Sequence, residues 1–95
     1  MKQIERIKQM ERCLDQASAA VMELSAALDQ YMAAREAIHA LEAYYGSDWR
    51  KDFEDDVAGL LPKDLKRGVL SEDGIWNLLA DNRQLNRQMQ EVVKD

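Results

Sequence analysis

Apolar side chains recur at alternating steps of three and four along the first half of the chain. This spacing places them on one face of an α-helix. No glycine or proline interrupts the stretch from Lys2 to Tyr45, which is rich in residues that favour helices. The pattern predicts one long helix over about residues 2–45. Its apolar row consists of Ile7, Met10, Leu14, Ala17, Val21, Leu24, Leu28 and Tyr31.

A second periodic stretch closes the chain and predicts a shorter helix over about residues 72–94. Its apolar face consists of Ile75, Leu78, Leu85, Met89 and Val92. Two helices joined by a folded connection pack antiparallel on each other. We therefore expect an all-α fold in which the long N-terminal helix packs antiparallel on the shorter C-terminal helix. Residues 1–95 would form a single helical-hairpin domain.

The two apolar faces also predict a register. With Tyr45 level with the start of the last helix, the opposed pairs are Leu41 and Ile75, Ile38 and Leu78, Tyr31 and Leu85, Leu28 and Met89, and Leu24 and Val92. The same register opposes Arg35 and Asn82, the polar interruptions of the two faces. A polar pair of this kind fixes register at some cost in stability.

Between the helices, residues 46–70 are expected to form a capping segment with one or two short helices. Gly46 is the expected left-handed residue that ends the long helix. Ser47 is the expected N-cap of a short helix over about residues 48–57, and Gly59 is expected to stop it.

The second half of the capping segment leads into the last helix. Pro62 is expected to open another short turn over residues 63–67, which Gly68 closes. Ser71 is the expected N-cap of the last helix, with Leu70 and Ile75 at the positions of a hydrophobic staple. An aromatic cluster is expected at this closed end, made of Tyr44, Tyr45, Trp49, Phe53 and Trp76.

The last helix is about half as long as the first, so the hairpin leaves residues 1–21 without a partner. Their apolar stripe forms the candidate interface, which consists of Ile4, Ile7, Met10, Leu14, Ala17 and Val21. Contiguous apolar surface of this kind usually marks an interface. We expect a homodimer in which the N-terminal halves pack on each other or on the partner's hairpin, with an unidentified protein partner as a further possibility. The competing structure is a first helix that bends and folds back on itself, but no glycine or proline marks a bend.

A row of alanines runs beside this stripe, with a member every seven residues: Ala19, Ala26, Ala33 and Ala40. Two interpretations stay open. The alanines could allow another backbone to approach closely, or they could fill exposed positions of a stable helix.

Charge and composition exclude several classes of partner. The net charge is −5, and each third of the chain is mildly negative, so no basic face for nucleic acid is expected. No apolar stretch is long enough to span a membrane. Cys13 is the only cysteine, so no intramolecular disulfide can form. We expect a cytoplasmic protein.

The capping segment is dense in charge and offers the weak candidate metal ligands Asp48, Asp52, Asp55 and Asp56. Carboxylates are the ligands that Mg²⁺ and Ca²⁺ prefer, but these do not match a calcium loop, and no second helix supplies a matching acidic motif. His39 has no second histidine or cysteine to share a metal. No cofactor and no catalytic residue is predicted. The other interpretation is a solvated face held by pairs of acidic and basic side chains.

Three strings carry a resemblance that covers nearly the whole chain: IERIKQME near the start, YYGSDWRKDFEDD, and GLLPKDLKRGVLSEDGIWNLL. Together they resemble a family of short bacterial proteins known only as a domain of unknown function, and LPKDLKRGVLSEDG is the most specific part. The resemblance implies a family but no activity and no catalytic residues.

Two functional hypotheses follow. The first is a non-enzymatic helical protein that acts by self-association and protein–protein interaction, as an adaptor or scaffold. The alternative is a small all-α metal- or nucleotide-binding protein, or a hydrolase, with a site in residues 48–71. The continuous apolar row and the absence of a nucleophile–base or metal constellation favour the first.

Overall fold

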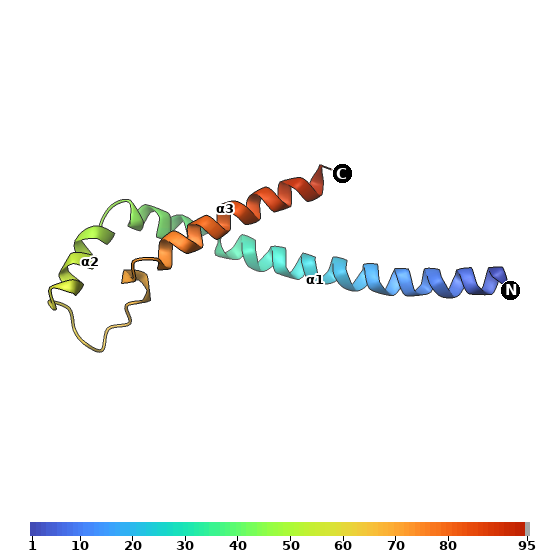
Figure 1. Ribbon diagram of the computed structural model, residues 1–95, viewed down its shortest axis with the longest axis horizontal. Helices are drawn as coiled ribbons and strands as arrows, with labels where there is room; N and C mark the ends of the chain where they lie inside the picture. Colours follow the sequence, from blue (N-terminus) through green and yellow to red (C-terminus); the bar gives the residue numbers. More distant parts are fainter. Residues whose placement is uncertain (95) are drawn as a thin grey trace. The chain divides into compact units, whose positions relative to one another are not determined.

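The computed structural model describes residues 1–94, and these residues form helices and connecting turns without a strand. The elements are α1 (Lys2–Tyr45), α2 (Trp49–Val57), the 3₁₀-helix η1 (Gly68–Leu70) and α3 (Gly74–Val93) (Figure 1). The predicted all-α class is confirmed. The long helix has the predicted bounds, whereas the last helix begins two residues later than predicted.

The chain divides into two compact units, Met1–Arg35 and the part from Glu36 onward. The first unit is a single helix, the greater part of α1. None of its residues is buried, and only Tyr31 is half-buried. Its helical state therefore rests on the intrinsic preferences of its residues and not on packing within the unit.

The second unit contains the last turns of α1 together with α2, η1 and α3, and it holds the core. Leu70, Ile75 and Leu79 are the buried apolar residues of the described chain. Leu70 lies in η1 and Ile75 in the first turn of α3, and these two elements are in contact. Both side chains predicted for the hydrophobic staple are thus in the core.

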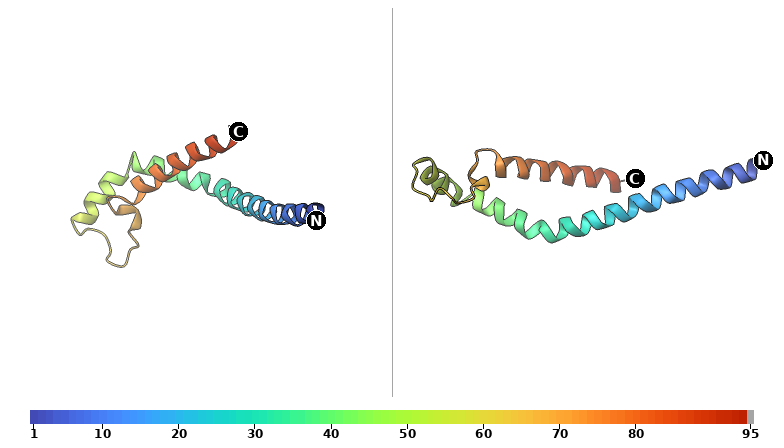
Figure 2. Two further views of the ribbon diagram at one scale, coloured as in Figure 1. Left: turned by 45° about the vertical axis from the view of Figure 1, so that its right-hand side comes forward. Right: turned by 90° about the horizontal axis from the view of Figure 1, so that it is seen from below.

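Within this unit α3 runs back in the direction opposite to the end of α1 (Figure 2). Leu41 and Ile38 on α1 are half-buried, and Ile75, predicted to oppose Leu41, is only 3% exposed. The expected pairs of α3 with residues before Glu36 join the two units and stay predictions, among them Arg35 with Asn82.

Two details of the end of α1 differ from the sequence prediction. The one glycine with positive φ among residues 1–94 is Gly59, at 76°, so Gly46 is not left-handed. The Gly46 amide instead donates to the Glu42 carbonyl at 3.2 Å and continues the helical pattern. Ser47 is not an N-cap either, because its hydroxyl donates back to the Ala43 carbonyl at 2.8 Å.

As a result α2 begins after Asp48, whose side chain makes no capping hydrogen bond. The Ser47 hydroxyl thus bonds to the end of α1, and the start of α2 has no side-chain cap. Gly59 is the true left-handed stop, which is the role that its missing Cβ permits.

Ser71 is not the N-cap of α3, because this helix begins after Asp73, whose side chain makes no capping hydrogen bond, but Ser71 still bonds to the start of the helix. The Ser71 hydroxyl accepts a hydrogen bond from the Gly74 amide at 3.1 Å, as an N-cap side chain does. It also donates to the Gly68 carbonyl at 3.0 Å. Ser71 therefore joins η1 to α3.

The turn predicted over residues 63–67 opens at Pro62 as expected, but it ends at Leu65, and Gly68 begins the 3₁₀-helix instead of closing the turn. The loop holds a turn closed by the Leu65 amide on the Pro62 carbonyl at 3.3 Å, and the short helix follows it at Gly68–Leu70. The Arg67 side chain also donates to two carbonyls of the loop, those of Pro62 and Lys63, and the Pro62 oxygen accepts both this bond and that of the Leu65 amide.

Candidate functional site

The charged capping segment uses three of its four candidate metal ligands in contacts within the protein. Asp52 accepts from the Tyr44 hydroxyl at 2.6 Å, and Asp55 lies 3.4 Å from the Lys51 ammonium. Asp56 pairs with Arg67 at 2.9 Å. Each acid thus faces a different donor, and the charge density of the segment has a structural explanation.

The Tyr44–Asp52 hydrogen bond connects the last turn of α1 to the first turn of α2. The bond stabilises the neutral phenol, and this effect, with burial and the charges of Asp52 and Asp48, raises the pKa of Tyr44 to about 12. The neutral donor therefore persists well above physiological pH. The bond holds the angle between two helices separated by only three residues.

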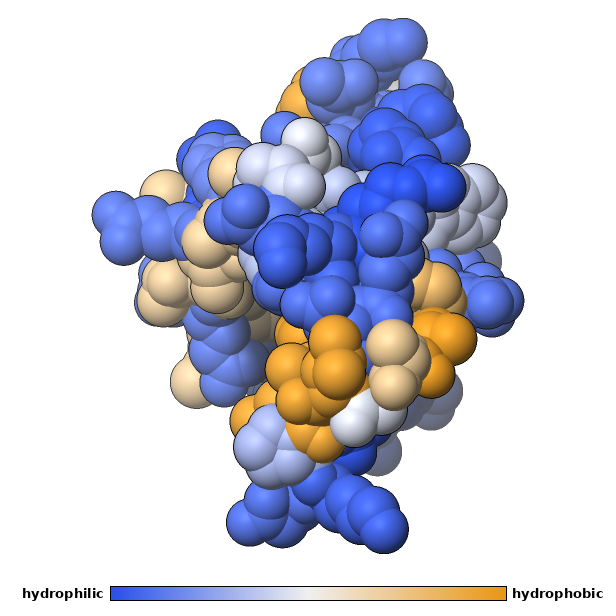
Figure 3. Space-filling model, turned by 90° about the vertical axis from the view of Figure 1, so that its left-hand side faces the viewer, coloured by the Kyte–Doolittle hydropathy of each residue, from blue (hydrophilic) through white to orange (hydrophobic). Residues whose placement is uncertain are grey.

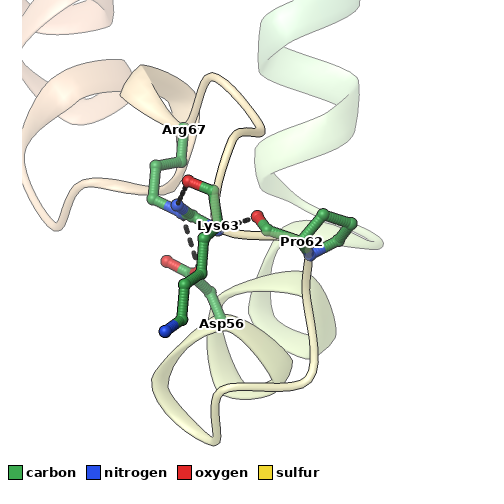
Figure 4. A network of polar contacts seen from close by, with 4 residues as sticks. All are labelled: Asp56, Pro62, Lys63 and Arg67. Atoms are coloured by element: carbon green, nitrogen blue, oxygen red, sulfur yellow. Dashed lines mark hydrogen bonds and ion pairs between the residues drawn. The ribbon is translucent and has the colours of Figure 1, made fainter.

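Arg67 forms the second connection, between α2 and the loop that follows it (Figure 4). Its Nε donates to Asp56 Oδ1 at 2.9 Å, Nη1 to the Lys63 carbonyl at 3.2 Å and Nη2 to the Pro62 carbonyl at 2.7 Å. The planar guanidinium suits this task because its donors point in several fixed directions. One side chain thereby holds the loop against α2.

Aromatic side chains form the third connection. Tyr45, Trp49 and Phe53 contact one another in series along the end of α1 and one face of α2, with both ring-centroid distances at 5.0 Å. The Tyr45 and Trp49 rings are tilted by 51°, and the Trp49 and Phe53 rings are stacked at 13°. The Trp49 Nε1 donates to the Val69 carbonyl at 2.7 Å and so joins α2 to η1. Trp76, also expected in this cluster, lies 55% exposed on α3, so its predicted place in an aromatic core is wrong.

No group of three or more His, Cys, Asp or Glu side chains within residues 1–94 is arranged to hold a metal ion. Asp48 is exposed at the turn before α2, while the other three candidates have the partners given above. His39 and Cys13 both lie exposed on α1. A shallow hollow on α3, lined by Asp81, Gln84, Leu85 and Gln88, contains a single carboxylate.

Tyr44 and Arg67 make the important contacts that the sequence did not predict, with Asp52 and Asp56 respectively. Tyr44 was expected only as an apolar ring, and Arg67 only as one member of a basic group. The separations of eight and eleven residues to their partners carry no periodic signal, because they depend on how the intervening turns fold.

The candidate interface on α1 is open to solvent. Ile4, Ile7, Met10, Leu14 and Val21 are between 47% and 67% exposed, and Ala17 is exposed as well. These are large apolar side chains on a helix that buries none of its residues. Their exposure makes this face the largest regular apolar feature of the first unit.

A second apolar area lies in the second unit, over α2 and the loop after it. Val57, Leu60, Leu65 and Val69 are exposed there. Figure 3, which faces this end, shows apolar side chains gathered on an otherwise polar surface. The four residues lack the helical repeat of the α1 row.

None of the helices in the described part of the chain combines the length and the apolar character needed to cross a bilayer. A family model described as "Domain of unknown function (DUF4298)" matches residues 7–92. The comparisons with curated proteins and with solved structures found no match.

Proposed function

We propose that this chain, which belongs to the family of unknown function DUF4298, is a non-enzymatic helical protein that works by self-association. It would act as an adaptor or scaffold that presents its second unit to protein partners. The observation that carries the proposal is the exposed apolar stripe of the candidate interface, within residues 4–21 of α1, which has no partner element within its own unit.

The size of this face suits a reversible dimer. Each large aliphatic side chain that is exposed to this degree loses on the order of 80 Å² of solvent-accessible surface when a partner covers it. The five large side chains of the candidate interface on each chain would bury roughly 800 Å² in a dimer, which is below the about 1,200 Å² of specific interfaces. We therefore expect association at micromolar concentrations and not a permanent dimer.

The second unit supports a role without catalysis. Its charged side chains hold α2 and the loop in place through Tyr44–Asp52 and Asp56–Arg67. Protein partners fit the net charge of −5 better than nucleic acid does, because phosphate backbones require a local excess of basic residues. A cytoplasmic location fits the lone, exposed Cys13.

Light scattering on the purified chain tests the proposal. We expect a mass that rises with concentration from 10.9 kDa towards twice that value. Leu14→Gln should keep the chain monomeric, because it places an amide in the apolar row. Met22→Gln is the matched control, since Met22 is 72% exposed but lies outside the row. A mass of 10.9 kDa at all concentrations up to the high micromolar range would refute self-association.

The alternative, a metal- or nucleotide-binding site in residues 48–71, calls for a separate measurement. A ligand that binds only the folded state raises the melting temperature. Melting curves with Mg²⁺, Mn²⁺, Ca²⁺ and a panel of nucleotides should coincide with the curve of the free protein. A clear rise that Asp52→Ala or Asp55→Ala abolishes would favour the alternative.

A further inference from the structure

We infer that the apolar stripe of the candidate interface, within residues 4–21 of α1, docks on the apolar area over α2 and the following loop of a second copy of this chain. This loop patch consists of Val57, Leu60, Leu65 and Val69, which are 73%, 71%, 46% and 43% exposed. Each chain gives its stripe to the loop patch of its partner and receives the partner's stripe on its own. This contact rests on the proposed self-association and specifies the surface that covers the stripe.

Neither apolar surface is large enough to pair only with its own copy. Two stripes that face each other bury roughly 800 Å², and two loop patches, with four large side chains each, bury roughly 600 Å². Both areas are below the about 1,200 Å² of specific interfaces. When each stripe covers a loop patch, nine large side chains of each chain are covered, and the buried area reaches roughly 1,400 Å². Of these arrangements, only the exchange of stripe and patch reaches the size of a specific interface.

Contacts within the second unit hold the loop patch in shape. Arg67 binds the loop to Asp56 of α2 (Figure 4), and the Trp49 Nε1 donates to the Val69 carbonyl at 2.7 Å. Apolar side chains are gathered at this end of the second unit (Figure 3). The surface is therefore formed before a partner arrives, which reduces the conformational entropy that binding costs.

The charges beside the two surfaces are opposite. Glu11 and Asp15 are exposed and lie one helical turn apart along one edge of the stripe, and neither belongs to an ion pair within residues 1–94. Lys63 and Lys66 are exposed in the loop that carries the patch. The Lys63 ammonium points away from the contacts of Arg67 (Figure 4), so it is open to a carboxylate of a second chain.

The charge of the loop also determines which edge of the stripe faces it. Residues 58–69 carry a net charge of +2, whereas the rest of the chain carries −7. The other edge of the stripe bears Lys2 and Arg6, which the loop lysines would repel. The acidic edge therefore faces the loop. Two loop patches that faced each other would instead bring lysines together.

Self-association of full-length variants tests the contact. Leu60→Gln, in the loop patch, should raise the dissociation constant of the dimer at least about tenfold, as Leu14→Gln does in the stripe. Val93→Gln is the matched control for the patch, because Val93 is 80% exposed and belongs to neither surface. Near-ultraviolet circular dichroism of Leu60→Gln should match the wild type, which shows that the second unit is still folded.

Mixing the variants identifies the partners. A mixture of Leu14→Gln and Leu60→Gln chains should associate more tightly than either variant alone, because the intact stripe of one then meets the intact patch of the other. Wild-type association of Leu60→Gln, or no recovery in the mixture, would overturn the inference and leave self-association standing. A wild-type chain that stays monomeric at all concentrations would refute both.

Charge reversal tests the orientation. Glu11→Lys with Asp15→Lys changes the net charge from −5 to −1, so weaker overall repulsion alone would tighten association. We expect an approximately tenfold higher dissociation constant instead, because these lysines would meet Lys63 and Lys66. Adding Lys63→Glu and Lys66→Glu to the same chain should restore the wild-type value to within about threefold. Tighter association of the first variant, or no restoration in the second, would contradict the assigned edge.

Discussion

At the scale of single residues, Gly74 shows how a close contact can override a helix preference. A Cβ built on Gly74 would lie 2.6 Å from the Ser71 hydroxyl oxygen and 2.9 Å from the Gly68 carbonyl oxygen. The same two oxygens are joined by the hydrogen bond that connects η1 to α3. The space at Gly74 is therefore part of the junction that starts α3.

We predict that Gly74→Ala destabilises the protein by about 1–3 kcal/mol, the usual range for overpacking. Helix preference alone would give the opposite sign, since alanine stabilises a helix interior by about 0.5–1 kcal/mol relative to glycine. Urea unfolding at one protein concentration decides between the two. Gly68→Ala is the matched control, because a Cβ there meets no atom within 4 Å, and a loss of equal size in both variants would contradict the explanation.

Tyr44 is the second residue whose contact has a measurable consequence. Its pKa of about 12 in the folded protein exceeds the ordinary value of 10.0. Between these values the unfolded chain releases a proton that the folded protein retains, so this contribution to stability is present below pH 10 and is lost as the pH rises to about 12.

Tyr44→Phe should lower the free energy of unfolding at neutral pH by about 0.5–1.5 kcal/mol, the net value of one hydrogen bond. The difference between wild type and variant should shrink as the pH rises from 10 to about 12. Unfolding curves of both proteins across this range provide the measurement. A difference that stays constant would mean that the ring contributes only by packing.

At the scale of elements, Arg67 determines how the loop after α2 is held. Its three donor contacts reach Asp56 and two loop carbonyls, whereas a lysine offers one charged nitrogen that cannot reach all three. Arg67→Lys should therefore release the loop while keeping the charge.

The expected effect is cleavage of the loop by trypsin after Lys63 and Lys66 that is faster by about tenfold, which corresponds to about 1.4 kcal/mol in the cost of opening. Arg50→Lys serves as the control, because its pair with Glu54 lies on the exposed face of α2 and its side chain is 84% exposed. Equal cleavage rates in the two variants would show that Arg67 does not restrain the loop.

The elements differ in how far the sequence could predict them. The apolar period predicted α1 to its last residue, and glycine and serine marked the borders of the shorter elements. Ser47 was assigned to the wrong helix because it lies between two helices in the sequence, and only the folded turn shows that its hydroxyl bonds to the Ala43 carbonyl of α1. Gly59 is the left-handed stop after α2, as predicted, whereas Gly46 continues the helical pattern at the end of α1 and is not left-handed.

The candidate site was also predictable only in part, because some of its contacts depend on how the turns fold. The α1 row follows from spacing alone, so its position on the helix was evident. The partners of the acids in α2 were not, because Tyr44 and Arg67 reach them only after the turns have folded. The charged side chains that suggested a ligand site in the sequence instead hold the segment together through these contacts.

At the scale of the whole molecule, the two units are stabilised by different means. The second unit has a buried core and several connecting hydrogen bonds. The first unit has no buried residue, and isolated helices in water are only marginally stable. If a second copy covers the apolar stripe of the candidate interface, the helicity of the first unit should depend on protein concentration while the packing of the second unit does not.

Dilution should therefore separate two signals. Far-ultraviolet circular dichroism, which reports mainly on α1, should lose intensity on dilution through the low micromolar range. The near-ultraviolet signal of the Tyr45–Trp49–Phe53 stack should stay constant, because all three rings belong to the second unit.

Leu14→Gln should show the reduced helical signal at concentrations where the wild type is still fully helical, and Met22→Gln should follow the wild type. The two signals then report two transitions, so a single free energy of unfolding would not describe the protein. Coincident loss of both signals at every concentration would mean that the chain unfolds as one cooperative unit, and that α1 is not stabilised by a second copy.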